Sequence, residues 1–378
     1  MDEMQSMPDL ITCLKRQTVR DFTLYVCVNQ PDSWWDDGDD EHLRICRANA
    51  ELLEFLAREC PEAVLINYSS RARGWQGKAN GVGWARKVLF SRILDDCSGD
   101  EVIVSLDADT TFPDTYFEDL IDKFNRHPQC SAVSVPYFHP LSGDEAADRL
   151  MLRYECYMRH YLINLYEIGN PHAFSALGSA MAFPAWAYRR VGGITPLQGG
   201  EDFYLMQKFA KTGLILCSLA SVVNPSGRVS GRVPFGTGPA VGMALGEQRQ
   251  RYPFYSAASF ALVERTFAMF PTLYDSDAET PMSPFLRQQL KTDDLWSPLR
   301  NNFKTRELFV RACAEKVDGL RILQYLRSVS SQLPPEEPAV DFGTASIATL
   351  DSYRNSLFMK EMRLRRDKKF VGIASQSK

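Results

Sequence analysis

The stretch EVIVSLDADTTFP, residues Glu101–Pro113, joins a run typical of a buried strand to two acidic residues. Asp107 and Asp109 are separated by one residue, so on an extended chain their side chains point to the same side. Two carboxylates that close together repel each other unless a cation lies between them. Hard oxygen ligands of this kind suit Mg²⁺ or Mn²⁺. A simple turn or helix cap is the alternative, and this motif alone does not separate the two.

The segments around this stretch alternate between strand and helix patterns. Branched and aromatic residues predict strands at Phe22–Asn29, Ala63–Tyr68, Glu101–Leu106 and Ser131–Phe138. Apolar residues at helical spacing predict helices at His42–Glu59 and Gly83–Asp96. This alternation indicates an α/β fold with a mostly parallel sheet flanked by helices. In such sheets ligands bind at the carboxyl ends of strands, which is where Asp107 lies.

The two ends of the chain depart from this alternation. Met7–Thr18 has a helical pattern and no strand precedes it, so we expect the first strand of a doubly wound sheet to be missing. From about Met243 onward the pattern is helical, with a linker near residues 332–345 and a last helix at Ile347–Lys369. We therefore expect an α/β domain over residues 1–240 and a mainly helical region over residues 241–378.

Composition excludes several classes of protein. The net charge of the 378 residues is −4, whereas a protein that mainly grips nucleic acid normally carries a basic surplus, so we expect no nucleic-acid partner. No run of about 20 apolar residues predicts a membrane span. The first residues, MDEMQSMPDL, carry acids where a signal peptide needs positive charge. We therefore expect a cytoplasmic protein.

A second chemically informative stretch runs from Ser175 to Gly213. The small residues Gly178 and Ser179 allow a backbone to approach a ligand closely. Two glycines then precede Glu201 and Asp202, which open a predicted helix. Acidic residues at a helix start can simply satisfy the free N–H groups and the helix dipole. Alternatively, a carboxylate held near an acceptor hydroxyl can act as a general base.

Taken in order, the segments resemble a family 2 glycosyltransferase of the GT-A fold over roughly residues 8–220. The resemblance is carried by CLKRQTVRDFTLYVCVNQPD, RGWQGKANGVGWARK, VSLDADTTFPDTYFEDL, ALGSAMAFPAWAYRRVGGI and GGEDFYLMQKFAKTG. It implies an inverting, metal-dependent enzyme of the hexosyltransferase type. Such an enzyme moves a sugar from a nucleoside-diphosphate sugar to an acceptor hydroxyl.

The resemblance also implies roles for individual residues. Asp202 is expected to be the catalytic base, with Glu201 orienting it or the acceptor. Asp107 and Asp109 are expected to hold the Mn²⁺ or Mg²⁺ ion, with Asp107 near the ribose. The resemblance and the phosphate-binding chemistry of basic side chains together place the nucleotide-sugar site at Asn29, Asp32, Gly77, Lys78, Arg86, Asp107, Gly178, Ser179, Arg228 and Arg232.

Several of these assignments have alternatives. Lys78, Arg228 and Arg232 can instead be solvated loop residues. Asn29 stands near where the family usually carries an aspartate, which leaves the nucleotide base open. Some family members supply a histidine to the metal, and this chain has SVVNPSGRVSGRVPFGTG in that region.

Two other functions and several partners stay open. A nucleotidyltransferase that makes sugar nucleotides can share this fold, and a degenerate transferase fold can survive as a binding protein. The acceptor can be a glycan, a lipid-linked molecule or a small molecule. The basic end of the last helix predicts either a solvated face or peripheral contact with the inner face of the membrane.

Overall fold

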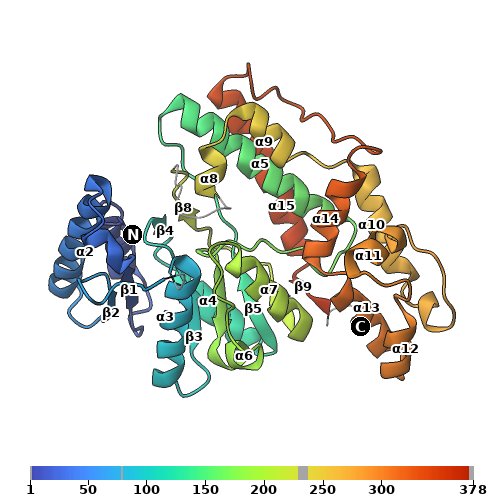
Figure 1. The fold of residues 1–378 in the computed structure, drawn as a ribbon, viewed down its shortest axis with the longest axis horizontal. Helices are drawn as coiled ribbons and strands as arrows, with labels where there is room; N and C mark the ends of the chain where they lie inside the picture. Colours follow the sequence, from blue (N-terminus) through green and yellow to red (C-terminus); the bar gives the residue numbers. More distant parts are fainter. Residues whose placement is uncertain (1, 78–79, 229–236, 374–378) are drawn as a thin grey trace. The chain divides into compact units, whose positions relative to one another are not determined.

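The computed structural model describes residues 2–77, 80–228 and 237–373 (Figure 1). The chain divides into two compact units. The first comprises Met1–Gly143, Ala176–Met206 and Leu219–Gly242, and the second comprises Asp144–Ser175, Gln207–Ser218 and Met243–Lys378. The predicted domain boundary near residue 240 stays a prediction, and two internal segments group with the C-terminal unit.

The first unit combines helices with short strands (Figure 1). Its helices are α1 (Met7–Arg16), the short 3₁₀ helix η1 (Asp32–Trp35), α2 (Asp40–Glu59), α3 (Val82–Asp96), α4 (Tyr116–Arg126), α6 (Ala185–Arg190), α8 (Thr237–Val241) and the start of α7 (Glu201–Thr212). Its strands are β1 (Tyr25–Asn29), β2 (Val64–Tyr68), β3 (Val102–Ser105), β4 (Thr110–Thr111), β5 (Cys130–Ser134), β6 (Met181–Pro184) and β8 (Asn224–Pro225). The α/β prediction is confirmed, and the four predicted strands are β1, β2, β3 and β5.

Strand pairing in this unit is mixed, so the prediction of a mostly parallel sheet is wrong. β1 and β2 pair in parallel. β6 pairs antiparallel with both β3 and β5, in the register Ile103↔Phe183 and Val133↔Ala182. β4 and β8 form a further antiparallel pair. The reason is that β6, which the sequence pattern did not reveal, lies between β3 and β5 and runs against both.

Local sequence explains where the flanking helices form. Asp39 caps α2 by accepting hydrogen bonds from the backbone N–H groups of Glu41 and His42. In α4, Tyr116, Leu120 and Phe124 are four residues apart and form a buried stripe. Helix α3 packs against β1, and α6 packs against β5 and β6. The first unit therefore has a core between its strands and these apolar helix faces.

The second unit is mainly helical. Its helices are α5 (Glu145–Glu167), α9 (Leu245–Arg251), α10 (Ala257–Met269), η2 (Thr272–Tyr274), α11 (Ser283–Leu290), α12 (Ser297–Asn302), α13 (Arg306–Lys316), α14 (Gly319–Val329) and α15 (Ile347–Asp367). The expected helical C-terminal region is confirmed. It also contains a strand that the pattern did not predict, because β9 (Phe370–Val371) pairs antiparallel with β7 (Leu214–Leu216).

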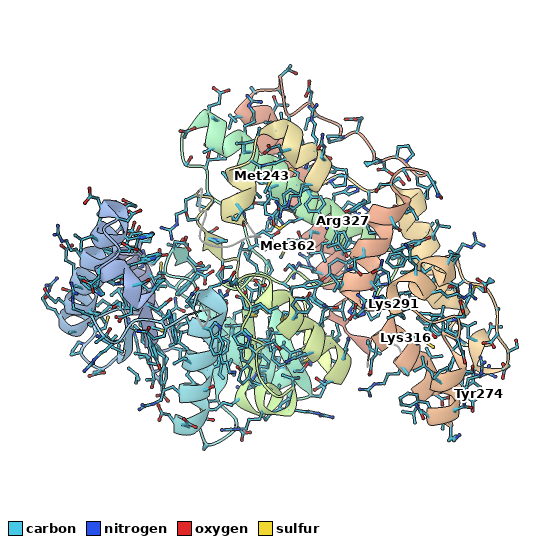
Figure 2. All side chains as sticks on the ribbon, in the orientation of Figure 1. Met243, Tyr274, Lys291, Lys316, Arg327 and Met362 are labelled. Atoms are coloured by element: carbon cyan, nitrogen blue, oxygen red, sulfur yellow. The ribbon has the colours of Figure 1, made fainter. Side chains whose placement is uncertain are left out.

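Helix boundaries in this unit follow from caps. The helical pattern after residue 304 breaks into α13 and α14, because the Asp318 side chain accepts from the N–H of Arg321 and starts a new helix. Helix α11 ends at Leu290, and the next residue, Lys291 (Figure 2), caps it. The backbone of Lys291 is left-handed, with φ of 52°. Residues 332–345, the predicted linker, form no helix or strand.

Helix α15 packs along α5 through buried ion pairs rather than only apolar contacts. Arg159 of α5 lies 2.6 Å from Glu155 and 2.5 Å from Glu361 of α15. Glu361 also binds Arg365 at 2.6 Å, and all four side chains are buried. Part of the basic end of this helix therefore serves packing inside the unit. Among the described helices, none has the length and apolar character needed to cross a bilayer.

Candidate active site

Arg86 joins two acidic segments that are far apart in the sequence. It lies on α3, where its Nη2 is 2.5 Å from Oδ1 of Asp107 and its Nη1 donates to Oε1 of Glu201. Arg86 and Glu201 are buried, whereas 43% of the Asp107 side chain is exposed. Burial opposes the positive charge, but Asp107 and Glu201 outweigh it and raise the pKa of Arg86 above its usual value. The predicted residues Arg86, Asp107 and Glu201 therefore form one group.

Gly178 provides the space for this guanidinium group. A Cβ atom at this position would lie 2.1 Å from Nη2 of Arg86, which no side chain tolerates without displacing the arginine. The backbone oxygen of Gly178 accepts a hydrogen bond of 2.6 Å from Oγ of Ser105, the last residue of β3. Ser179 follows and is buried. The small residues predicted to admit a ligand thus admit a neighbouring arginine in this structure.

Asp202 stands beside this group at the start of α7. Gly200, two residues earlier, has φ of +76°, a left-handed conformation that glycine adopts without strain. Oδ1 of Asp202 accepts a hydrogen bond of 2.7 Å from the N–H of Phe203. Burial, with a smaller contribution from the Glu201 charge, raises the pKa of Asp202 to about 7, although Arg86 acts in the opposite direction. Because the side chain is only partly buried, it combines a raised pKa with solvent access.

Asp109 belongs to a second ion-paired group. The β4–β8 pair brings its backbone oxygen to the N–H of Ser226, at 3.2 Å. Its Oδ2 lies 3.1 Å from Nε of Arg228, and Nη2 of Arg228 lies 2.5 Å from Oε2 of Glu3. The structure thus places the predicted phosphate-binding Arg228 directly beside a predicted metal ligand. Glu3 is a partner that the sequence did not reveal, since nothing in the first residues distinguishes it.

Asn29 and Asp32 form hydrogen bonds to the loop that contains Gly74 and Trp75. Nε1 of Trp75 donates to Oδ1 of Asn29 at 3.1 Å, and the N–H of Gly74 donates to Oδ1 of Asp32 at 3.2 Å. The Trp75 ring stacks on Tyr68 with centroids 4.1 Å apart. Among the described residues, no hydrogen bond or ion pair joins Asn29 or Asp32 to Asp107, Glu201 or Asp202.

The remaining predicted site residues lie beside this loop or outside the described residues. Gly77 has φ of +60°, so the loop turns there in a left-handed conformation. Lys78 and Arg232 lie outside the described residues. Sequence reasoning missed Trp75 and Tyr68, although an aromatic residue immediately before Gln76 and Gly77 was a visible signal.

Residues 102–274 match the model of the Glycosyl transferase family group 2. The chain resembles these glycosyltransferases. The matched range contains Asp107, Asp109, Gly178, Ser179, Glu201, Asp202 and Arg228. Arg86 and the loop around Trp75 lie before it. No curated protein matches the sequence.

Two solved glycosyltransferase structures are distantly similar to the chain. One is the mannosyltransferase PcManGT from Pyrobaculum calidifontis in complex with GDP-Man and Mn²⁺, with 16% identity and a TM-score of 0.34; the match covers 97% of this chain and 83% of that one. The other is GalNAc-T7 with UDP, GalNAc and Mn²⁺, with 12% identity and a TM-score of 0.36; the match covers 88% of this chain and 56% of that one.

The two aspartates of this segment carry carboxylate oxygens, the kind of ligand that Mg²⁺ and Mn²⁺ prefer. Within the described residues, no three His, Cys, Asp or Glu side chains form a group that could hold a metal ion by themselves. Mg²⁺ is usually bound through one or two carboxylates together with substrate phosphates and water. In this structure Asp107 pairs with Arg86 and Asp109 pairs with Arg228, and the exposure of Asp107 leaves its carboxylate accessible to a ligand.

Proposed function

We propose that this protein is a metal-dependent, inverting glycosyltransferase that moves a sugar from a nucleoside-diphosphate donor to an acceptor hydroxyl. The observation that carries the proposal is the group formed by Asp107, Glu201 and Arg86, with Asp202 beside it. Asp107 comes from the segment that the resemblance associates with donor binding. Glu201 and Asp202 come from the segment that it associates with the catalytic base. The match of residues 102–274 to a glycosyltransferase family supports the same reaction class.

Asp202 and Glu201 differ in a way that separates their roles. Glu201 is buried and held by Arg86, so it is suited to position its neighbour. Asp202 is partly accessible and has a pKa of about 7, so near neutral pH it can accept a proton from an acceptor hydroxyl. The deprotonated oxygen then attacks the anomeric carbon on the face opposite the leaving diphosphate. A single displacement of this kind inverts the anomeric configuration.

Asp107 and Asp109 are the residues that would hold Mn²⁺ or Mg²⁺. When bound, the ion supplies Lewis-acid stabilisation of the charge on the departing diphosphate. Arg228 lies 3.1 Å from Asp109 and 2.5 Å from Glu3, and guanidinium groups also suit phosphate oxygens. We assign Arg228 to binding the donor diphosphate. Trp75 and Tyr68 form an aromatic pair beside Asn29 and Asp32, which we assign to the nucleotide end of the donor.

A donor screen tests this function directly. The full chain is incubated with each of a panel of nucleotide sugars, with Mn²⁺ or with EDTA, and release of the nucleoside diphosphate is measured. We expect metal-dependent hydrolysis of at least one donor, because water can take the place of the acceptor and hydrolyse the bound nucleotide sugar. Release of pyrophosphate from a sugar 1-phosphate and a nucleoside triphosphate would instead identify a nucleotidyltransferase. Nucleotide binding without any turnover would identify a binding protein.

A further inference from the structure

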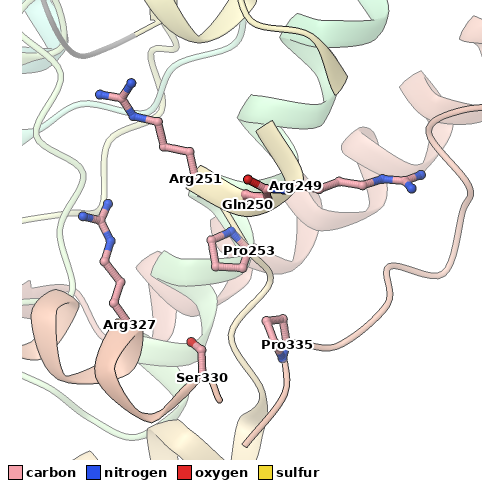
Figure 3. A pocket seen from close by; sticks show the side chains of 7 residues that line it. All are labelled: Arg249, Gln250, Arg251, Pro253, Arg327, Ser330 and Pro335. Carbon is pink, nitrogen blue, oxygen red and sulfur yellow. The ribbon is translucent and has the colours of Figure 1, made fainter. Parts of the chain in front are cut away.

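The second unit contains a basic hollow whose lining includes none of the residues assigned above. Its volume is about 410 Å³ and it is lined by Arg249, Gln250, Arg251, Pro253, Arg327, Ser330 and Pro335 (Figure 3). We call this set the arginine hollow. Its residues come from α9, from α14 and from the segments that follow these two helices. None of the seven lining residues is acidic, so the hollow has a positive lining.

Arg327 carries a charge that no acidic side chain in the described part of the chain balances. It lies on α14 (Figure 2), and its Nε donates to Oη of the buried Tyr255 at 3.4 Å. None of the described carboxylates lies within ion-pair distance of Arg327. In Figure 3 the side chains of Arg251 and Arg327 extend to the same side of the hollow. Arg249 extends to the other side and is paired with Asp341 at 3.2 Å.

A buried arginine adds to the positive field behind this surface. Arg153 of α5 is 3% exposed, and its Nη2 donates to the backbone oxygen of Tyr252, next to the lining residues Arg251 and Pro253. Its Nη1 has no hydrogen-bond partner among residues 2–77, 80–228 and 237–373. Burial lowers the pKa of Arg153 to about 10, and the nearby charge of Arg249 also lowers it. An anion in the hollow would relieve this crowding of positive charge.

We propose that the arginine hollow binds the phosphate group of a phosphorylated ligand. The guanidinium groups of Arg251 and Arg327 match the several oxygens and the double charge of a phosphate. The volume exceeds that of a lone phosphate and falls within the range of roughly 300–1,000 Å³ typical of small-molecule sites. The phosphate can belong to a water-soluble ester or to a lipid headgroup, since the chemistry of recognition is the same.

Calorimetry with inorganic pyrophosphate in EDTA tests the site without relying on sugar transfer. EDTA removes divalent cations, so binding that needs a metal at Asp107 and Asp109 does not contribute. We compare the wild-type chain with R251Q/R327Q and with R363Q/R366Q. The second pair is the matched control, because both arginines are exposed on α15 and the change in net charge is identical. We expect affinity to fall on the order of tenfold for each hollow arginine lost and to stay unchanged in the control.

Each outcome decides the proposal. Failure of wild type to bind pyrophosphate, or equal binding by wild type and R251Q/R327Q, overturns it. If R251Q/R327Q does not fold, R251K/R327K keeps the charge but loses the forks, and weaker binding by that variant supports the proposal while unchanged binding overturns it. Because binding is measured without a donor sugar, the result is independent of whether the chain is a glycosyltransferase.

A vesicle arm identifies the source of the phosphate. Sedimentation is measured with phosphatidylcholine vesicles prepared with and without phosphatidic acid. Binding that requires phosphatidic acid and the hollow arginines supports a lipid phosphate, whereas pyrophosphate binding without such sedimentation supports a soluble ester. Sedimentation that depends instead on Arg363 and Arg366 assigns vesicle contact to α15 and overturns a lipid-binding role for the hollow.

Discussion

Arg86 and Asp107 form an ion pair with 2.5 Å between Nη2 and Oδ1, and the same guanidinium group binds Glu201. Asp107 is 21 positions away from Arg86 in the sequence, and Glu201 is 115 positions away. One buried cation therefore fixes the distance between the segment that we assign to the donor and the segment that we assign to the base. The integrity of this bridge is the first requirement of the proposed mechanism.

Replacing Arg86 tests the bridge. Arg86→Leu leaves the buried Glu201 without its cation, and removing one partner of a buried pair typically costs about 3–5 kcal/mol. We expect transfer to be lost and the urea midpoint to fall. Arg92→Gln, on the exposed side of the same helix, is the control and should change stability by less than about 0.5 kcal/mol. Full activity of Arg86→Leu would show that the bridge is dispensable.

Gly178→Ala tests the space that the bridge needs. The added methyl group would displace the Arg86 guanidinium, so we expect lower turnover and a loss of stability of about 1–3 kcal/mol, measured by thermal unfolding. Gly246→Ala is the matched control, because a Cβ there meets nothing within 4 Å and alanine is the better helix former. If both variants behave alike, contact with Gly178 does not position Arg86.

The pKa of Asp202 predicts a pH profile. A base must be deprotonated to work, so kcat/KM should rise with pH and level off above about 7. Asp202→Asn should lower turnover by about 10²–10⁴-fold and leave donor binding largely intact. A wild-type profile without this rise, or normal turnover of the variant, contradicts the assignment of Asp202 as base.

The same pKa has a consequence for stability. It is raised in the folded chain from 3.8 to about 7, so the folded state binds the proton more tightly than the unfolded state. The stabilising effect of this proton is therefore present below pH 4 and is lost as pH rises to 7. We expect Asp202→Asn to raise the Tm relative to wild type at pH 8 and to give a smaller difference at pH 5. An equal difference at both pH values would contradict the raised pKa.

The ion pairs between α5 and α15 predict that the single substitution Glu361→Gln greatly lowers the free energy of unfolding. Glu361→Gln leaves Arg159 and Arg365 buried without the carboxylate that joins them, at a cost of about 3–5 kcal/mol in the free energy of unfolding. Glu264→Gln, at an exposed position on α10, is the control. The measurement is urea unfolding followed by circular dichroism. A loss below 1 kcal/mol would show that the network does not stabilise the packing of α15.

Local pattern was sufficient for much of the fold. Between residues 22 and 138, the observed ends of the predicted strands and helices lie within a few residues of the predicted ends. This agreement arises because apolar periodicity and helix caps act over short distances. β6 escaped detection because Met181–Pro184 has no β-branched residue and ends in proline, so its strand conformation depends on pairing with β3 and β5. Because β6 runs antiparallel to both β3 and β5, strand pairing in this unit is mixed.

The sequence by itself determined the α/β class, the helical C-terminal region and the residue types needed for the proposed sugar transfer. Only the tertiary structure decided that Arg86 joins Asp107 to Glu201, that Gly178 makes room for it, and that Arg228 lies against Asp109 and Glu3. The physical reason is range: helix and strand patterns repeat over a few residues. Ion pairing and burial depend instead on which distant segments the folded chain brings within a few ångströms.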